Sequence, residues 1–244
     1  MTGARLLSAI VVAVTLAGCT VAPSPGPAPV SVPAQPQEPR VSSEQAVSNF
    51  QTVATRVEPV AERMCRAQTE GVNCDFRILV DTREGQPVNA FHTLSQDGQP
   101  LIVFTVALIA DARNQDEIAF VMGHEAAHHI AGHLAEMQQE AELGEIAGSL
   151  LASVLASGAS DAARGEIIQQ AAQAGAFVGS RTYSKDRELE ADALGTVIAA
   201  RAGYDPLRGA AFFSRLPDPG DRFLGSHPPN SDRVRVVREV AAGL

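Results

Sequence analysis

The chain has 244 residues, 45% of them hydrophobic, and a formal net charge of -9. This length and apolar content predict one globular domain once the ends are set aside. The acidic balance speaks against nucleic acid as a partner, and the low aromatic content of 5%, without tryptophan, argues against a large aromatic recognition surface.

Residues 1–18 resemble a bacterial lipoprotein signal peptide. An apolar run from Leu6 to Leu16 has the length of a secretory signal core and is too short to span a bilayer. It leads into the sequence LAGC, which resembles the lipobox whose final cysteine is lipidated. We therefore expect a lipid on Cys19 and a bacterial periplasmic location. The following Thr20 favours the outer membrane under enteric sorting rules, and an ordinary signal peptide with a chance cysteine is the alternative.

A proline-rich tether is expected over residues 19–42. Residues 20–40 contain seven prolines among small and polar residues, a composition that buries no core and behaves as an extended spacer. The folded domain is therefore expected over residues 43–244. Within it, Cys65 and Cys74 are an even pair in an oxidising compartment, which predicts a short disulfide loop, with free buried thiols as the alternative.

The first part of the domain is predicted to contain one helix and a small sheet. An amphipathic helix starts at Ser43 and has a kink or break near Pro59. Three short segments separated by turn residues then predict the strands of a meander. We expect His92 to be exposed at a strand end rather than functional. The predicted strands are residues 76–81, 88–93 and 101–106.

The rest of the domain is predicted to be helical. Asn114 with Glu117 three residues later resembles a capping box and predicts a helix that runs to about residue 139. Residues 140–180 are rich in Ala, Gly and Ser, and predict either a core helix hairpin or a mobile lid. Their apolar part is too short for a transmembrane helix. The expected fold class is therefore α+β and mainly helical. Further helices are predicted over residues 185–202, up to 216, and 232–242.

The sequence HEAAH at residues 124–128 has the spacing of a metal-binding helix. His124 and His128 are one helical turn apart, so both imidazoles reach one metal ion. Glu125 projects about 100° round the helix from His124, too far to be a ligand but close enough to contact a water at the metal. A zinc hydrolase needs two neutral nitrogen ligands and a carboxylate base, so the sequence predicts one Zn2+ per chain and a third ligand elsewhere.

Two groups of such hydrolases differ in the third ligand. In one group a histidine follows at a fixed spacing after a glycine. Here Gly132 and His133 each miss that spacing by one residue. On a continued helix His133 would point about 180° away from His124. We therefore expect His133 and His129 to be surface or second-layer residues.

The other group takes a glutamate from a later helix. In the sequence SKDRELEAD at residues 184–192, Glu188 and Asp192 share one helix face. Glu188 is the predicted third ligand. Asp192 is predicted to accept a hydrogen bond from the far nitrogen of a ligand histidine, which fixes the ring. Glu190 lies on another face and is expected to be solvated, and the alternative for the whole segment is an exposed charged helix.

With these motifs the chain resembles the HtpX-like and CAAX-prenyl-protease-like family of gluzincin metallopeptidases, in its small periplasmic lipoprotein form. The matches cover nearly all of residues 44–244, although Lys185 stands where arginine is usual. The resemblance implies a zincin-type metallopeptidase domain with a small β-sheet beside the HEAAH helix. The matching stretches are NAF at 89–91, HEAAH at 124–128, residues 184–192, GYDP at 203–206, SHPP at 226–229 and DRV at 232–234.

The resemblance implies roles for further residues. Asn89, Ala90 and Phe91 look like the family's edge strand, which pairs with an extended substrate backbone. His227 is expected near the metal, where it either stabilises the oxyanion or takes the open metal position and keeps the enzyme latent. A structural histidine before a Pro-Pro turn is the alternative. Arg233 is expected to orient this loop or to pair with a site carboxylate.

Together these features predict a zinc-dependent endopeptidase in which Glu125 takes the proton of the attacking water and delivers it to the leaving amine. The expected substrates are unfolded or misassembled envelope proteins, and the expected role is envelope protein quality control. We expect membrane contact through the N-terminal lipid, no flanking membrane helices and no separate partner-binding domain. The rivals are a lipoprotein assembly factor with a latent zinc site and a structural zinc site. The intact base Glu125 argues against both.

Overall fold

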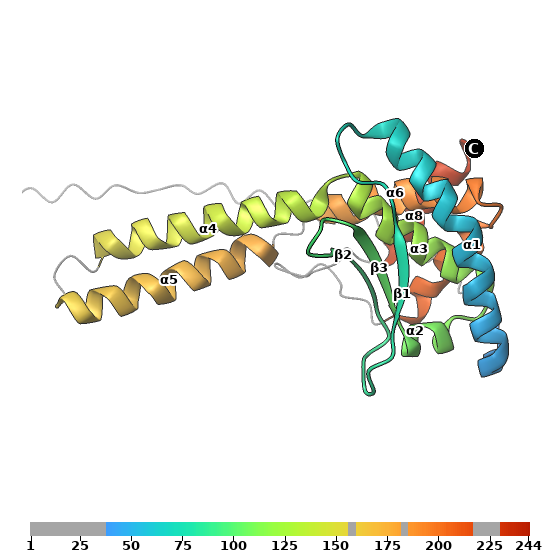
Figure 1. Ribbon diagram of the computed structural model, residues 1–244, viewed down its shortest axis with the longest axis horizontal. Helices are drawn as coiled ribbons and strands as arrows, with labels where there is room; N and C mark the ends of the chain where they lie inside the picture. The colour runs from blue at the N-terminus through green and yellow to red at the C-terminus, as the bar shows by residue number, and fades with distance from the viewer. Residues whose placement is uncertain (1–37, 156–159, 182–184, 217–229) are drawn as a thin grey trace, which may run out of the picture. The chain divides into compact units, whose positions relative to one another are not determined.

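The computed structural model describes residues 38–155, 160–181, 185–216 and 230–244. Helices dominate these residues and one three-stranded sheet is present, which confirms the predicted mainly helical α+β fold class (Figure 1). The signal peptide, the lipidation position Cys19, most of the tether, Ser184 and His227 lie outside the described residues. In chain order the elements are α1 (Ser43–Gln68), β1 (Arg77–Asp81), β2 (Ala90–Leu94), β3 (Pro100–Thr105), α2 (Val106–Asp111), α3 (Gln115–Ile130), α4 (His133–Leu155), α5 (Asp161–Arg181), α6 (Lys185–Arg201), α7 (Pro206–Gly209), the 3-10 helix η1 (Ala210–Arg215) and α8 (Asn230–Ala241).

Helix α1 is one continuous amphipathic helix. Ser42 caps it by accepting a hydrogen bond from the backbone N–H of Gln45 at 3.2 Å. Of the kink or break predicted near Pro59, the break does not occur: the helix continues to its end at Gln68. A proline removes one backbone donor, but Val57 before it and Val60 after it are both buried, so core packing holds the two halves of the helix together.

The disulfide predicted for the two cysteines of the domain is present. Cys65 near the end of α1 and Cys74 before β1 are joined, with their Cα atoms 5.7 Å apart. Both side chains are buried. The bond ties the end of α1 to the segment that leads into the sheet.

The sheet has the strand order β1-β3-β2, so the predicted meander is wrong. Strands β2 and β3 form an antiparallel hairpin closed by the backbone hydrogen bond from Ser95 to Gln99. Strand β1 pairs with the other side of β3, in parallel. The turn residues correctly predicted where one strand ends and the next begins. They do not determine which strand each one pairs with in the sheet.

Helix α3 is the central element of the fold. Its first turn is capped as predicted: the side-chain oxygen of Asn114 accepts a hydrogen bond from the backbone N–H of Glu117 at 3.0 Å. The helix packs against α1, α6 and the sheet, and nearly all its residues are buried. The ring of Phe120 packs edge-on against Phe213 of η1, with centroids 5.3 Å apart. Because the helix is buried on nearly every side, the core fixes the position of its histidines.

Helix α3 ends at Ile130, nine residues before the predicted end at about residue 139. Gly132 has a φ of 77°, a left-handed conformation that interrupts the helix. The chain then restarts as α4 at His133. The prediction of one long helix was wrong because the glycine after Ile130 acts as a helix terminator.

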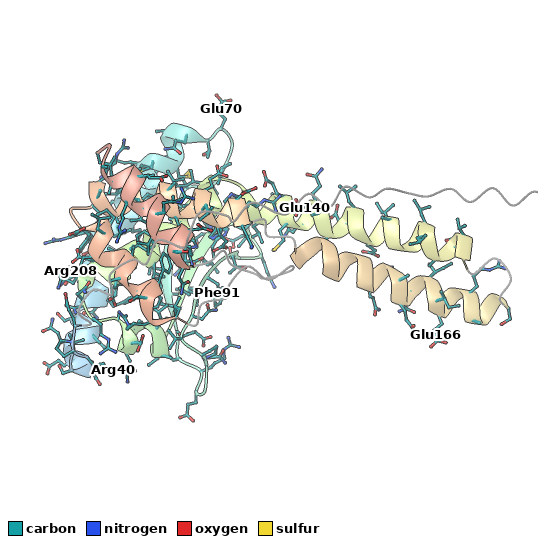
Figure 2. The ribbon with its side chains drawn as sticks, turned by 180° about the vertical axis from the view of Figure 1, so that it is seen from behind. Arg40, Glu70, Phe91, Glu140, Glu166 and Arg208 are labelled. Atoms are coloured by element: carbon teal, nitrogen blue, oxygen red, sulfur yellow. A yellow bond between two sulfur atoms is a disulfide. The ribbon has the colours of Figure 1, made fainter. Side chains whose placement is uncertain are left out.

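Helices α4 and α5 form a hairpin whose two helices pack mainly against each other, and Figure 2 labels Glu140 on α4 and Glu166 on α5. The predicted hairpin is therefore present. It is not a core hairpin, because large aliphatic side chains of α4 are exposed. None of the described helices is long and apolar enough to cross a membrane. The exposed side chains, 56% to 71% accessible, are Leu143, Ile146, Leu150, Leu151 and Val154.

Candidate metal centre

Two glycines allow α3 and α6 to approach closely. A Cβ on Gly123 would lie 2.8 Å from the backbone oxygen of Gly195, and a Cβ on Gly195 would lie 2.8 Å from the backbone nitrogen of His124. Any larger residue at either position would push the helices apart. The contact brings the first turns of α6, which carry Glu188 and Asp192, to the histidines of α3.

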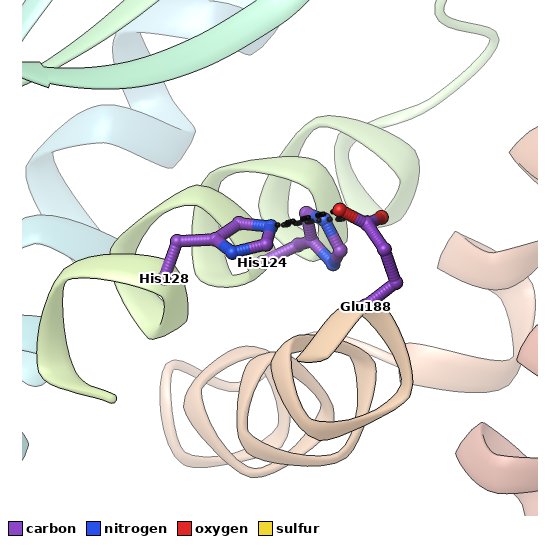
Figure 3. A group of neighbouring side chains, drawn as sticks. All are labelled: His124, His128 and Glu188. Atoms are coloured by element: carbon purple, nitrogen blue, oxygen red, sulfur yellow. Dashed lines mark hydrogen bonds and ion pairs between the residues drawn. The ribbon is translucent and has the colours of Figure 1, made fainter. Parts of the chain in front are cut away.

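Three side chains from these helices converge on one point (Figure 3). The Nε2 atoms of His124 and His128 are 3.0 Å apart. The Glu188 carboxylate oxygens lie 3.6 Å from Nε2 of His124 and 3.5 Å from Nε2 of His128. Zinc bonds of about 2.0–2.2 Å in a tetrahedron place ligand atoms roughly 3.3 Å from one another. The three predicted ligands therefore have the spacing and the donor atoms that one zinc ion needs, and their role as ligands stays a prediction.

The two histidines differ in protonation. Burial alone lowers the pKa of His124, but its hydrogen bonds to Asp192 and Glu188 outweigh this effect and raise the pKa to about 10. Burial and the neighbouring charge of His124 lower the pKa of His128 to about 2. The raised pKa means that His124 holds a proton between the carboxylates of Asp192 and Glu188. A divalent cation bound by His124 and Glu188 would replace this proton.

Asp192 contacts the nitrogen of His124 that faces away from His128, as predicted from the sequence. Its Oδ1 lies 2.9 Å from Nδ1 of His124. Arg233 of α8 binds both oxygens of Asp192, with two N–O distances of 2.7 Å. Burial raises the pKa of Asp192, but the charge and hydrogen bonds of Arg233 outweigh burial and leave it below its usual value. The Arg233 guanidinium also stacks on the ring of Phe213 at 3.7 Å, so one buried arginine fixes the carboxylate that orients His124.

Glu125 lies next to the three converging side chains and faces an open pocket. Burial raises its pKa, while the charge of His124 lowers it. The expectation that His92 is exposed was wrong: it is partly buried, and its Nε2 lies 3.1 Å from Nδ1 of His129. A sequence pattern does not reveal this contact, because the two histidines lie on different elements, β2 and α3.

Strand β2 presents backbone groups at the free edge of the sheet, beside this pocket. The backbone of Asn89 makes two hydrogen bonds to Thr105 of β3. Its carbonyl oxygen accepts from the Thr105 N–H, and its N–H donates to the Thr105 side-chain hydroxyl. Along an antiparallel strand, the backbone N–H and C=O groups of successive residues point alternately toward the neighbouring strand and away from it. The backbone groups of Phe91 therefore also point toward β3, whereas those of Ala90 and His92 point toward the free edge of the sheet. Of the three predicted strand residues, only Ala90 offers free-edge backbone groups.

The pocket beside Glu125 has mainly apolar walls. It lies between the start of β2, α2, α3, η1 and α8. Its polar part is formed by Asn89, His124, Glu125, Asn230 and Arg233. Its dimensions and lining suit an apolar side chain of a ligand that lies along β2. The apolar wall residues are Val88, Leu108, Phe120, Val121, Phe212, Phe213 and Leu216.

The remaining histidines of the HEAAH region are buried. His129 contacts the backbone oxygen of Asn73 at 2.7 Å and the ring of His92 at 3.1 Å, on the side toward the sheet. His133 is 1% exposed and lies against His128. Of the two expected locations, surface or second layer, the structure rules out the surface for both. The 180° orientation expected for His133 is wrong, because Gly132 interrupts the helix.

The fold and this cluster define a metallopeptidase of the zincin type. Residues 48–241 match peptidase family M48, and the chain belongs to this family. The predicted family resemblance is therefore confirmed. The putative beta-barrel assembly-enhancing protease of Vibrio cholerae serotype O1 is 35% identical over 142 residues, which are 55% of this chain and 29% of that protein. The chain thus matches less than a third of the length of this relative.

Proposed function

We propose that the protein is a zinc-dependent endopeptidase. The observation that carries this proposal is the convergence of His124, His128 and Glu188 at zinc-ligand spacing, with Glu125 beside them on the same helix. Structural zinc sites use four protein ligands, whereas catalytic sites use three and keep a nearby base. Among the residues that the structure describes, the group of three ligand residues with an adjacent carboxylate favours catalysis.

Glu125 acts as the general base and then as the general acid. It takes the proton of the attacking water and passes it to the leaving amine. Burial raises its pKa above the ordinary carboxyl value, which makes it a stronger base for taking up that proton. Zinc, when bound, supplies a Lewis acid that acidifies water and polarises the scissile carbonyl. Asp192 and Arg233 keep His124 oriented throughout.

The substrate is an extended peptide that adds to the edge of β2. The outward backbone groups of Ala90 and His92 are available for such pairing, which reads backbone rather than side chains. Next to Glu125, the apolar pocket receives one side chain near the scissile bond. Specificity is therefore broad, with a preference for an apolar residue at one position.

The natural substrates in this proposal are unfolded or misassembled envelope proteins, cut in protein quality control. Three observations support the setting, and the first two are the lipobox-like sequence that ends at Cys19 and the name of the Vibrio cholerae relative, which refers to β-barrel assembly. In this setting the lipid on Cys19 anchors the enzyme in the periplasm, at the outer membrane. The short disulfide between Cys65 and Cys74 suits an oxidising compartment.

The test compares wild type with Glu125→Gln, and uses Glu142→Gln on the exposed face of α4 as the matched control. Bound zinc and digestion of an unfolded casein are measured on the same preparations. We expect equal zinc in all three proteins and loss of cleavage by a factor of at least about 100 in Glu125→Gln alone. Equal cleavage by Glu125→Gln and wild type would refute the mechanism. Zinc without cleavage in wild type would favour the assembly factor with a latent site.

A further inference from the structure

His133 lies directly behind the metal centre, at the nitrogen of His128 that faces away from Glu188. The Nδ1 atoms of His128 and His133 are 2.9 Å apart. The other nitrogen of His133, Nε2, lies 3.4 Å from Glu190 Oε2. His133 is 1% exposed, whereas the Glu190 side chain is 64% exposed. The three side chains of His128, His133 and Glu190 therefore form a row that leads from the metal centre to the surface.

The position of each proton in this row follows from what a metal ligand requires. His128 directs Nε2 toward His124 and Glu188. A ligand nitrogen must be unprotonated, so neutral His128 carries its proton on Nδ1. The atom that faces this N–H is Nδ1 of His133, which must then be the acceptor. Neutral His133 in turn carries its proton on Nε2, the nitrogen that faces the Glu190 carboxylate.

The break between α3 and α4 creates this contact. Five residues after His128 on a continuous helix, His133 would be turned about 140° away from it. The left-handed Gly132 redirects the chain, so that the first residue of α4 faces back onto α3. Arg187 of α6 binds the carboxylates of Glu136 and Glu140 and so fixes the first turns of α4 against α6.

We propose that His133 is a positioning residue for the metal ligand His128. It accepts the Nδ1–H hydrogen bond, fixes the tautomer and ring orientation of His128, and thereby raises the affinity for zinc. The proposal rests on the proposed function, in which His128 binds zinc. It makes His133 the counterpart of Asp192, which holds the Nδ1 of His124. The two ligand histidines of α3 are thus supported differently, one by a carboxylate and the other by a neutral imidazole.

The variants His133→Asn and His133→Leu test the hydrogen bond separately from packing. Asn and Leu have nearly the same size, but only Asn places an oxygen acceptor close to the position of the histidine Nδ1. We expect His133→Leu to weaken zinc binding about 10–100-fold in competition with a chromophoric chelator. His133→Asn should recover most of that loss. Asn49→Leu removes a buried polar group of α1 and is the control for a loss of stability alone.

A second readout does not depend on any variant. In long-range proton–nitrogen spectra of the zinc-loaded wild type, we expect His128 to carry its proton on Nδ1 and to bind zinc through Nε2. The opposite tautomer would overturn the proposal. So would a zinc affinity of His133→Leu equal to that of wild type, or equal losses in the Leu and Asn variants. If wild type binds zinc but does not cleave casein, the proposed function is overturned. The zinc affinities and the tautomer of His128 still decide the role of His133 in that case.

Discussion

The close contact of α3 and α6 predicts that Gly195→Ala damages the metal centre. The added Cβ would lie 2.8 Å from the backbone nitrogen of His124, 2.9 Å from its Cα and 3.1 Å from the carbonyl carbon of Gly123. These are backbone atoms, which no change of rotamer moves away. Carbon atoms pack at about 3.5–4.0 Å, so the helices must separate by roughly half an ångström or more. Overpacking of this kind costs about 1–3 kcal/mol of unfolding free energy.

The same displacement moves the ligand on α6. Glu188 and Asp192 lie on this helix, and a functional site tolerates an error of only about 0.5 Å. We therefore expect the zinc affinity of Gly195→Ala to fall at least about tenfold, as it does when support for a ligand is lost. Urea unfolding gives the stability, and competition with a chelator gives the affinity.

Two other glycines of the chain supply controls. Gly165 of α5 has open space around its Cβ position, so Gly165→Ala should be neutral or stabilise by up to about 1 kcal/mol. Gly148 of α4 packs on the backbone of Ala171, so Gly148→Ala should weaken the hairpin and leave zinc binding unchanged. The reasoning is refuted if Gly195→Ala matches wild type in both stability and zinc affinity.

Three further results are expected. Because the pKa of His124 is raised to about 10, zinc must displace a proton from it at lower pH. Apparent zinc affinity should then rise about tenfold per pH unit near neutrality, with about one proton released per zinc in calorimetry; a pH-independent affinity would contradict this. Asp192→Asn removes the carboxylate that binds the buried Arg233 most closely and leaves it Glu188 at 3.7 Å. The change should reduce the unfolding free energy by up to about 3–5 kcal/mol in urea, whereas a loss below about 1 kcal/mol would argue against the pair. Zinc at 100 times its dissociation constant should stabilise wild type by about 2.7 kcal/mol in thermal unfolding, and Glu188→Ala should lose this effect; an equal zinc response in both would exclude Glu188 as a ligand.

The parts of the site that depend on local helix geometry were predictable from the sequence. His124 and His128, like Glu188 and Asp192, are spaced by one turn, and a helix places such pairs on one face wherever it lies. The predicted grouping of His124, His128 and Glu188 needed one further assumption, that the two helices meet. That assumption came from the group of zinc hydrolases that take their third ligand, a glutamate, from a later helix.

The parts that depend on contacts between distant segments were not predictable. The approach of Gly123 to Gly195 produces no periodic pattern in the sequence. A glycine at a helix contact cannot be distinguished by sequence alone from a glycine elsewhere in a helix. The contact of the His92 ring with His129 joins two elements, β2 and α3, that are distant in the sequence. His133 was misplaced because the helix was extended through Gly132, although a glycine after a histidine-rich last turn is a known helix stop signal.

The most direct test of the account is anomalous diffraction at the zinc edge from crystals of the zinc-loaded protein. The account predicts one peak per chain, about 2.0–2.2 Å from Nε2 of His124, from Nε2 of His128 and from a carboxylate oxygen of Glu188. A peak on other side chains, or cleavage of casein by crystals that show no peak between these three residues, would contradict it.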